Sequence, residues 1–505
     1  MRAYLGIDIG TYESKGVLVD ADGQVLAMAA RPHRMLVPEP GFAEHRPVED
    51  WWGDFTQLSR RLITESGIDA RDIRAVGTSA IGPCMLPLDE AGAPLMNAVL
   101  YSVDTRAHRE IAELTDRLGA DRILTRCGNA LTTQSVGPKI LWLRRNRPDI
   151  FARTRRIVTS TSYLVLRLTG ACPIDHYTAS TWGPHYLIDE RCWSNELAAD
   201  IAPSALLPDL AWPTDIAGTV TAAAAAETGL APGTPVIAGT VDAAAEALSV
   251  GVREDGDMMM MVGSSIFIIE ITMERVSDRR LWSAPWLFPH QNAAMAMLAT
   301  AGTLTHWFRD TIGRDLDPAT ALPMLAQEAI SSPPGANGLV CLPYFAGIQT
   351  PWHDPAARGA FVGLDLSHGR ADLIRALLEG MALATRQIVE TFADVGQAPR
   401  RVFAVGGGTR NAPWSQAMSD AGGYTQILRA RTTGASYGDA FLAALAIGDV
   451  APDAIERWNT ITGEVRPDPA LRGLYDTRYA TFLALQDATR RLHGSSVTGK
   501  TDAAG

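Results

Sequence analysis

A strand that runs into a corner of small residues and continues as a second strand occurs twice in this chain. The first copy is GIDIGTYESKGVLVD (residues 6–20), and the second is GDMMMMVGSSIFIIEIT (residues 256–272). The glycine in each corner lets the backbone approach a ligand closely, and backbone N–H groups at such corners can hold phosphate oxygens. A unit that recurs halfway along a chain of 505 residues predicts two similar α/β domains that face each other.

The composition fits a chain of this size with a substantial core. Hydrophobic residues make up 47% and charged residues 20%, close to the globular averages, and the length indicates more than one domain. The net charge of −11 argues against a nucleic-acid or anionic-membrane partner, because both require basic patches. We find no signal peptide and no apolar run of about 18 residues that could span a membrane, so we expect a cytoplasmic protein.

Four strands of the predicted fold end in corners of small residues. A single Gly-Thr corner is most often an ordinary turn, but four of them on a two-domain pattern indicate a site for phosphate groups. The corners are Gly10-Thr11, Gly239-Thr240-Val241-Asp242, Gly263-Ser264-Ser265 and Gly406-Gly407-Gly408.

Two acids stand beside these corners, and phosphoryl transfer has a role for each. The reaction needs a metal ion to neutralise phosphate charge and a base that takes the proton of the attacking hydroxyl. Asp8 adjoins the first corner and suits Mg²⁺, directly or through water. Asp242 lies between a strand end and a helix start, where it could accept a hydroxyl proton. The alternative for Asp242 is an N-cap of the following helix.

The quoted segments resemble the motifs of the FGGY carbohydrate kinases, in the family's order, from residue 4 to about 448. GIDIGTYESKGVLVD is similar to the first phosphate motif, AGTVDAAAEALSVGV to the segment of the catalytic aspartate, and MVGSSIFI to the second phosphate motif. RGAFVGLDLSHGRADLIRALLEG (358–380) resembles the C-terminal signature, and VGGGTRNAPWSQAMSDAGG (405–423) the adenosine-binding stretch. The resemblance implies an α/β fold of two actin-like (ribonuclease H-like) ATPase domains around a central cleft.

We place the domain boundary after the Ala-rich helix that follows Asp242, where there is no long linker. This division gives an N-terminal sugar-binding domain over residues 1–250 and a C-terminal nucleotide-binding domain over residues 251–490. The small and polar segment 491–505 is expected to be disordered. Domains that are joined without a flexible linker can close on a ligand as rigid bodies.

The resemblance implies roles for individual positions. Asp8 and Thr11 would serve Mg²⁺ and the phosphates of ATP, and Asp242 would be the general base that activates a sugar hydroxyl. Lys15 lies where many members keep a basic residue, although it could equally be a solvated strand residue, and Asn411 could instead cap the next helix. The set implied for ATP is Gly10, Thr11, Lys15, Gly263, Ser264, Gly302, Gly407, Gly408 and Asn411.

The expected sugar pocket departs from the better-known members of the family. Xylulose-type kinases have Met-His-Gly or a similar polar group after the strand that in this chain leads into Ala80-Ile81-Gly82. These three residues stand at the corresponding place, so the polar histidine is absent. Glycerol kinases have Arg-Glu at the corresponding place, and this chain has neither residue there. Because buried polar pairing makes the selection of a polyol sharp, the change leaves the substrate open.

The remaining pocket candidates each have a structural alternative. Asp104 and Arg106 fall in the family's Asp-x-Arg segment and could contact substrate hydroxyls, or they could pair with each other. Trp182 and His185 could line the pocket wall, but a core tryptophan is as consistent with the sequence. The predicted substrate-binding set is Ile81, Gly82, Asp104, Arg106, Trp182 and Asp242.

These observations predict an ATP- and Mg²⁺-dependent kinase that phosphorylates a hydroxyl of a small sugar or polyol, with a ketopentose such as xylulose as the first choice. The rival interpretation is an actin-like ATP-binding scaffold or regulator. A scaffold would keep Asp8, Thr11 and the glycine corners but would need no base at Asp242. The expected partners are ATP and the sugar or polyol, and the oligomeric state is open, with a homodimer as one alternative.

Overall fold

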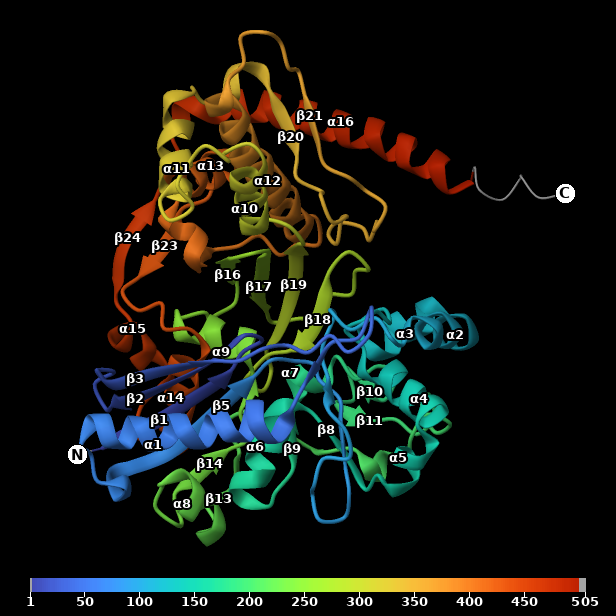
Figure 1. Ribbon diagram of the computed structural model, residues 1–505, viewed down its shortest axis with the longest axis vertical. Coiled ribbons are helices and arrows are strands. Elements are labelled where there is room, and N and C mark those ends of the chain that lie inside the picture. Colours follow the sequence, from blue (N-terminus) through green and yellow to red (C-terminus); the bar gives the residue numbers. More distant parts are fainter. Residues whose placement is uncertain (1, 499–505) are drawn as a thin grey trace, which may run out of the picture.

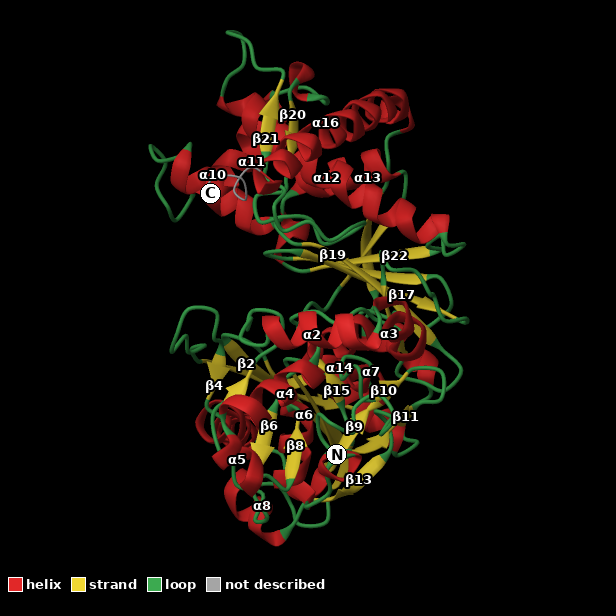
Figure 2. Cartoon of the chain, turned by 90° about the vertical axis from the view of Figure 1, so that its right-hand side faces the viewer, coloured by secondary structure: helices red, strands yellow, loops and turns green. Residues whose placement is uncertain are grey.

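The computed structural model describes residues 2–498, which fold into two α/β halves stacked along the long axis of the molecule (Figure 1). Each half is built on a seven-stranded mixed sheet. The strands of the first sheet come from residues 3–241, and those of the second sheet come from residues 257–465. Figure 2 shows the second sheet at mid-height, with helices above and below it.

The first sheet has the strand order β13–β14–β5–β1–β2–β3, with β15 paired to the end of β5. β1 runs antiparallel to β2 and parallel to β5, so Asp8 lies beside Lys15 on one side and Ser79 on the other. Its strands are β1 (Ala3–Ile9), β2 (Glu13–Asp20), β3 (Val25–Pro32), β5 (Ile73–Ala80), β13 (Ile216–Thr219), β14 (Pro235–Ile237) and β15 (Thr240–Val241).

The second sheet has the order β18–β19–β17–β16–β22–β23–β24. β16 runs antiparallel to β17 and parallel to β22, which repeats the relation of β1 to β2 and β5. The repeat that we predicted from the two strand–corner–strand segments is therefore present in the topology. The strands are β16 (Asp257–Val262), β17 (Ile266–Thr272), β18 (Trp282–Pro285), β19 (Asn292–Leu298), β22 (Arg401–Val405), β23 (Gln426–Arg429) and β24 (Ile461–Val465).

Short two-stranded pairs complete the β structure of the described residues. In the first half these strands are β4 (Glu44–His45), β6 (Leu86–Leu88), β7 (Ala98–Val99), β8 (Arg156–Val158), β9 (Pro173–Asp175), β10 (Tyr186–Leu187), β11 (Cys192–Trp193) and β12 (Asp209–Ala211). In the second half they are β20 (Val340–Leu342) and β21 (Ala360–Val362).

Helices cover the faces of both sheets, which explains why all seven residues of β1 are buried. The first half contains α1 (Asp54–Ser66), which follows a π-helical turn (Pro47–Gly53), and α2 (His108–Leu118), α3 (Ala120–Cys127), α4 (Val136–Asn146), α5 (Pro148–Arg153), α6 (Ser160–Thr169), α7 (His176–Ala179), α8 (Ala222–Thr228) and α9 (Asp242–Ser249). The second half of the sequence contains α10 (Gly302–Thr311), α11 (Ala321–Ser331), α12 (Arg370–Asp394), α13 (Ala412–Gly422), α14 (Ala435–Ala446), α15 (Ile455–Trp458) and α16 (Arg472–Thr498).

α14 comes from the second half of the sequence but packs on the first sheet. The backbone carbonyls of Ser436 and Asp439 approach Gly6 of β1 and Gly77 of β5 so closely that a Cβ atom on either glycine would collide with them. α14 also packs against α9. The two helices therefore belong to one apolar core that joins the first sheet to the second.

The C-terminal segment differs from the prediction. α16 continues through residues 491–498, which we expected to be disordered, and the rest of that predicted tail lies outside the described residues. In Figure 1 this helix extends beyond the body of the second half. Within residues 2–498, no helix is both long enough and apolar enough to cross a membrane.

Candidate active site

Two cavities share the corner between β16 and β17. The first cavity, of about 260 Å³, is lined from the first half by residues that include Thr11 and Asp242, and from the second half by residues that include Ser265. The second cavity has a volume of about 440 Å³. Its lining includes the predicted nucleotide residues Gly263, Ser264, Gly302, Gly407, Gly408 and Asn411. The Gly263-Ser264-Ser265 corner is therefore the point where the two cavities come together.

Four carboxylates gather beside the first cavity. Asp242 is the first residue of α9, and Glu246 follows one turn later on the same helix face. Asp8 lies near the end of β1, and Asp439 lies on α14. Ser79 links the last two, because its Oγ is 2.7 Å from Asp439 Oδ2 and 3.2 Å from Asp8 Oδ1.

Burial and mutual repulsion raise the pKa values of these acids. Burial raises the pKa of Asp242 to about 7; the N–H of Ala243, which donates to Oδ1 at 2.7 Å, opposes the shift, and the charge of Glu246 adds to it. Burial, followed by the charges of Asp242 and Glu246, raises the pKa of Asp8 well above its ordinary range. A carboxylate whose pKa is near neutrality can exchange a proton with a substrate hydroxyl, as a general base does.

The N-cap alternative for Asp242 does not match the structure. α9 begins at Asp242, and its N-cap residue is Val241. Asp242 accepts the N–H of the next residue, Ala243, instead of an N–H one turn further along the helix. The carboxylate thus stands at the helix N-terminus, where the backbone dipoles favour negative charge, and it lines the first cavity.

The acid cluster fits Mg²⁺ in the form in which kinases hold it. Within the described residues, no group of three or more His, Cys, Asp or Glu side chains is arranged to enclose a metal ion. Mg²⁺ in kinases binds through one or two carboxylates, water and substrate phosphates instead. In the described part of the chain, Asp439 Oδ1 is buried and has no hydrogen-bond partner. Together with the raised pKa of Asp8, this orphaned oxygen indicates a place where a cation would relieve excess negative charge.

Gly302 holds the shared corner in place. Its N–H donates to Gly263 O at 2.9 Å, and the N–H groups of Ala301 and Thr303 donate to Ser264 O at 2.9 and 3.2 Å. A Cβ atom on Gly302 would lie 2.5 Å from Gly263 O, so a side chain at this position would displace the corner. Gly302 lines the second cavity, and its nucleotide role stays a prediction.

The glycines after β22 form another wall of the second cavity. Gly407 and Gly408 line it, and a Cβ atom on Gly408 would collide with Val262. Asn411 lines it too, while its Oδ1 accepts the N–H of Trp414 at 3.2 Å and caps α13. Both interpretations of Asn411 are thus compatible with its position.

The first corner borders the other cavity. The N–H of Gly10 donates to Glu13 O at 3.1 Å and closes the turn. Thr11 lines the first cavity, with its Oγ1 3.0 Å from the hydroxyl of Tyr101. Lys15 is about half exposed, its Nζ is 3.4 Å from Glu13 Oε2, and it lines neither cavity. Lys15 acts on the site at a distance, because its charge lowers the otherwise raised pKa of Asp8.

Of the six predicted substrate residues, three line the first cavity, Asp242 among them, and three line neither cavity. Ile81 and Gly82 line the first cavity. Asp104 and Arg106 line neither cavity, because Arg106 Nη2 is 2.8 Å from both Asp104 Oδ2 and Glu44 Oε1 in a buried ion pair. The structural alternative, in which these two residues pair with each other, is the one observed.

The tryptophan that lines the first cavity is Trp282, and the predicted Trp182 is a core residue. Trp182 is fully buried in the core of the first half and lines neither cavity, and His185 is buried away from both cavities too. Trp282 begins β18 and belongs to an apolar wall that the second sheet contributes. This wall consists of Met261, Phe267, Trp282, Met295 and Met297.

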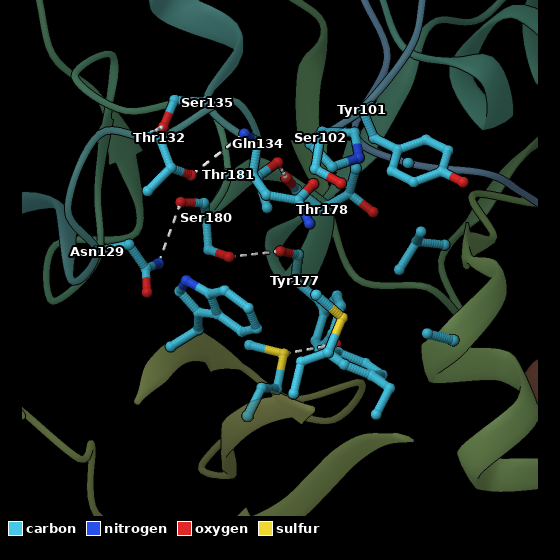
Figure 3. A pocket seen from close by; sticks show the side chains of 18 of the residues that line it. Tyr101, Ser102, Asn129, Thr132, Gln134, Ser135, Tyr177, Thr178, Ser180 and Thr181 are labelled. Carbon is cyan, nitrogen blue, oxygen red and sulfur yellow. Dashed lines mark hydrogen bonds between the residues drawn. The ribbon is translucent and has the colours of Figure 1, made fainter. Parts of the chain in front are cut away.

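The first half contributes most of the polar side chains of this cavity (Figure 3), together with apolar residues such as Ile81, Leu131 and Val241. The residues labelled there are Tyr101, Ser102, Asn129, Thr132, Gln134, Ser135, Tyr177, Thr178, Ser180 and Thr181. Gln134 Oε1 is buried and has no hydrogen-bond partner within the described residues. Since buried polar atoms are normally paired, this atom suits a hydroxyl group of a ligand.

Asn129 connects the two walls of the cavity. Its Nδ2 donates to Ser283 O at 2.8 Å, and its Oδ1 accepts the N–H of Ser283 at 2.8 Å. These two hydrogen bonds tie β18 of the second half to the first half. They hold Trp282, the neighbour of Ser283, at the cavity.

Sequence reasoning missed several residues of the site. Glu246 had a local signal, because it follows Asp242 by four positions on a helix, the spacing that puts two side chains on one face. Ser79, Asp439 and Trp282 had no such signal. They reach the site from strands and a helix that only the tertiary fold brings together.

Comparison with known proteins identifies one family over most of the chain. Residues 3–249 match the N-terminal domain of the FGGY family of carbohydrate kinases, and residues 258–447 match its C-terminal domain. The chain is 30% identical over 454 residues to a xylulose kinase of Bacillus subtilis (strain 168), which covers 89% of each protein. It is also 30% identical over 451 residues to a xylulose kinase of Escherichia coli (strain K12), covering 88% of this chain and 90% of that one.

Solved structures agree with the sequence comparisons. The crystal structure of xylulose kinase from Rhodospirillum rubrum has a TM-score of 0.92 at 33% identity, over 98% of this chain and 100% of that chain. A crystal structure of Plasmodium falciparum glycerol kinase with ADP shares the fold, with a TM-score of 0.86 at 21% identity over 96% of this chain and 98% of that chain. The predicted two-domain α/β fold is confirmed, and the scaffold alternative is not favoured. The chain belongs to the FGGY family of carbohydrate kinases and is an ATP-dependent sugar kinase.

Proposed function

We propose that this kinase phosphorylates a hydroxyl of a ketopentose such as xylulose, with Asp242 as the general base. The observation that carries the proposal is the Gly263-Ser264-Ser265 corner, which borders both the cavity that contains Asp242 and the glycine-lined cavity. A γ-phosphate at this corner would lie between a sugar in the first cavity and an adenosine in the second. The relatives that are named xylulose kinases support the choice of sugar.

In the transfer, the sugar hydroxyl loses its proton, and one oxygen bonded to the γ-phosphorus is replaced by another. The sugar hydroxyl oxygen forms a bond to the γ-phosphorus, while the bond from that phosphorus to the bridging oxygen breaks and its electron pair leaves with ADP. Asp242 takes the hydroxyl proton. Its pKa of about 7 suits this role, because an ionised fraction is present to accept the proton and the protonated acid can release it after turnover.

The phosphates would be held by backbone groups and by a metal ion. N–H groups of the Gly10-Thr11 and Gly263-Ser264 corners would donate to phosphate oxygens, and Gly407, Gly408 and Asn411 would hold the adenosine. Asp8, with Asp439 behind Ser79, is the side from which Mg²⁺ would be bound. When bound, Mg²⁺ would offset the negative charge on the phosphates during transfer.

The sugar would lie between unlike walls. Gln134 Oε1 offers an acceptor for one of its hydroxyl groups, since this atom is buried and unpaired within the described residues. The ring of Trp282 would pack on a C–H face of the sugar on the other side of the cavity. Water would be excluded once both ligands fill the space between the halves, which protects ATP from hydrolysis.

The test is ADP release across a panel of D-xylulose, D-ribulose, L-ribulose, glycerol and gluconate, with phosphorus and carbon NMR to locate the phosphate on the product. D-Xylulose is expected to have the highest kcat/KM. A preference of about tenfold or more for glycerol or gluconate would overturn the ketopentose assignment. ADP release that no sugar or polyol stimulates would overturn the proposed sugar chemistry as a whole.

Several expectations about the wider setting stay proposals. We propose that the domain boundary lies near residue 250. This position is at the start of the gap between the match to the N-terminal domain, which ends at residue 249, and the match to the C-terminal domain, which begins at residue 258. The net charge of −11 supports the absence of a nucleic-acid partner. A cytoplasmic location is kept as a proposal, and so is a homodimer, which sedimentation velocity would test.

A further inference from the structure

Two histidines hold three consecutive carbonyl groups of the turn between β1 and β2. Gly10 O is 2.9 Å from His33 Nε2, and Thr11 O is 3.1 Å from His45 Nε2. Tyr12 O accepts the backbone N–H of His33 at 2.9 Å. The C=O and N–H groups of a trans peptide point in opposite directions, so the N–H groups that follow these carbonyls face away from the histidines. Thr11 borders the first cavity.

The partners of His33 require a proton on both of its ring nitrogens. Nδ1 is 2.9 Å from Asp54 Oδ2 and Nε2 faces the Gly10 carbonyl, and an ionised carboxylate and a carbonyl can only accept. Both carboxylate oxygens of Asp54 also face other donors, because Arg31 Nε lies 2.5 Å from Oδ1 and Ser14 Oγ donates to Oδ2 at 2.8 Å. His33 is therefore an imidazolium that bridges a carboxylate and the turn.

The charged surroundings of His33 agree with this state. Burial acts to lower the pKa of His33, but the hydrogen bond and charge of Asp54 outweigh it, so the pKa is raised above its ordinary value. The titratable and charged groups around the ring come from four elements. They are Arg31 of β3, His45 of β4, Asp50 of the π-helical turn and Asp54 of α1.

His45 is held in the opposite state. The indole Nε1–H of Trp51 donates to His45 Nδ1 at 3.1 Å, so Nδ1 must be unprotonated while Nε2 donates to Thr11 O. Burial, followed by the charge of His33, lowers the pKa of His45 to about 4. The two rings meet edge to face with their centroids 4.9 Å apart. One charged and one neutral donor thus hold successive carbonyls of the same turn.

We propose that His33, as an imidazolium, and His45, as a neutral imidazole, are positioning residues that orient the peptide groups of the β1–β2 turn toward the phosphates of ATP. The inference rests on the proposed phosphate role of Gly10 and Thr11. Neither histidine lines the first or the second cavity, so both act through the turn. Loss of the second proton of His33 would remove the hydrogen bond that His33 donates either to Asp54 or to Gly10 O, and it would remove a positive charge beside the turn.

The kinetic test compares H33Q and H45Q with H368Q. His368 is a matched control, because its side chain is 2% exposed, its Nδ1 is 3.0 Å from Asp365 Oδ1, and it lines neither cavity. Loss of a charge-assisted hydrogen bond predicts that H33Q lowers kcat/KM for ATP by about tenfold or more. KM for the sugar should stay within about twofold, and H368Q should leave both constants unchanged.

The pH profile separates positioning from general stability. Because the charged form of His33 is the one that holds the turn, kcat/KM for ATP of the wild type should fall as the pH rises through the pKa of His33. D54N removes the carboxylate that sustains the charge, so it should move this fall to lower pH. H33Q should lack the fall. A purely structural role of His33 would lower activity equally at every pH.

The protonation states can be measured without any substrate. Nitrogen-15 NMR of histidine-labelled protein at neutral pH should show both nitrogens of His33 protonated and His45 protonated at Nε2 alone. This result does not depend on the sugar, so it separates this inference from the proposed sugar specificity. A neutral His33, or an H33Q variant with the KM for ATP and pH profile of the wild type, would overturn the inference. If H33Q does not fold, the inference is tested by the nitrogen-15 NMR spectrum of the wild type and by the pH profile of kcat/KM for ATP of D54N.

Discussion

Replacing Asp242 by asparagine separates its chemistry from its contribution to the structure. The asparagine keeps the size of the side chain and can still accept the N–H of Ala243, which lies 2.7 Å from Asp242 Oδ1, but it cannot take a proton. A positioned general base contributes about 10²–10⁴-fold to the rate, so kcat of D242N should fall by about this factor. KM for ATP should change little, because Asp242 lines the first cavity, the proposed sugar site, and not the second cavity, the proposed nucleotide site.

The pH dependence of the wild type follows from the pKa of about 7 for Asp242. About one-tenth of a group with this pKa is ionised at pH 6 and about nine-tenths at pH 8. Since only the ionised form can accept the proton, kcat/KM for the sugar should rise about tenfold across this range and then level off. D242N should show no such rise.

The same substitution should make the protein more stable. Asp242 has an ordinary pKa of 3.8 and a folded pKa of about 7, so between these values the unfolded state loses its proton first and stability falls as the pH rises. The difference corresponds to about 4 kcal/mol. The neighbouring acids share the cost of ionising the buried carboxylate, and water reduces this cost. We therefore expect the free energy of unfolding of D242N at pH 8 to exceed that of the wild type by about 1–2 kcal/mol.

The assay pairs coupled ADP release with thermal unfolding, both measured between about pH 5.5 and pH 9. We expect an inactive enzyme with an unfolding midpoint several degrees above that of the wild type at the alkaline end. A D242N variant with wild-type kcat would refute the role of Asp242 as the base. A variant that is both inactive and less stable than the wild type would refute the reasoning from the acid cluster.

Three further substitutions test other parts of the site. E246Q removes a charge that helps to raise the pKa of Asp242, so the acid limb of the sugar kcat/KM profile should move to lower pH; an unmoved limb would contradict the coupling. W282A should raise KM for the sugar about threefold to tenfold through loss of an aromatic contact, with KM for ATP unchanged, whereas the partly exposed Trp307, which lines neither cavity, should tolerate alanine. G302A places a methyl group 2.5 Å from a carbonyl of the shared corner, so KM for ATP should rise about tenfold or more while KM for the sugar stays constant; equal effects on both would argue against separate cavities.

The residues that the sequence located best are those whose chemistry is local. The corners at Gly10-Thr11 and Gly263-Ser264 and the acid Asp242 were visible because a strand, a small-residue turn and a helix start leave a pattern over a few adjacent positions. Their assembly into a shared site followed from the repeat of the strand–corner–strand unit, which the sheet topology confirms.

The sugar pocket could not be derived in the same way. Its apolar wall comes from side chains that alternate along four strands of the second sheet, and the same alternation occurs in any strand with one buried face. Trp182 and Trp282 look equally suitable in the sequence, and only the tertiary contact between Asn129 and Ser283 brings the latter to the cavity. Asp104 and Arg106 had the right chemistry, but they form a buried ion-pair cluster with the nearby Glu44, and neither residue lines a described cavity.

The position of α14 has a consequence for how such a protein can be divided or recombined. The segment Ala435–Ala446 closes the glycine-bearing face of the first sheet and brings Asp439 to Ser79, although six of the seven strands of the second sheet lie between it and the first sheet in the sequence. A polypeptide cut near residue 250 would therefore yield an N-terminal fragment with an open apolar face and an incomplete acid cluster. An exchange of the sugar-binding half with that of a relative would have to transfer two separate stretches of the gene, because the structural module is continuous in space but not along the chain.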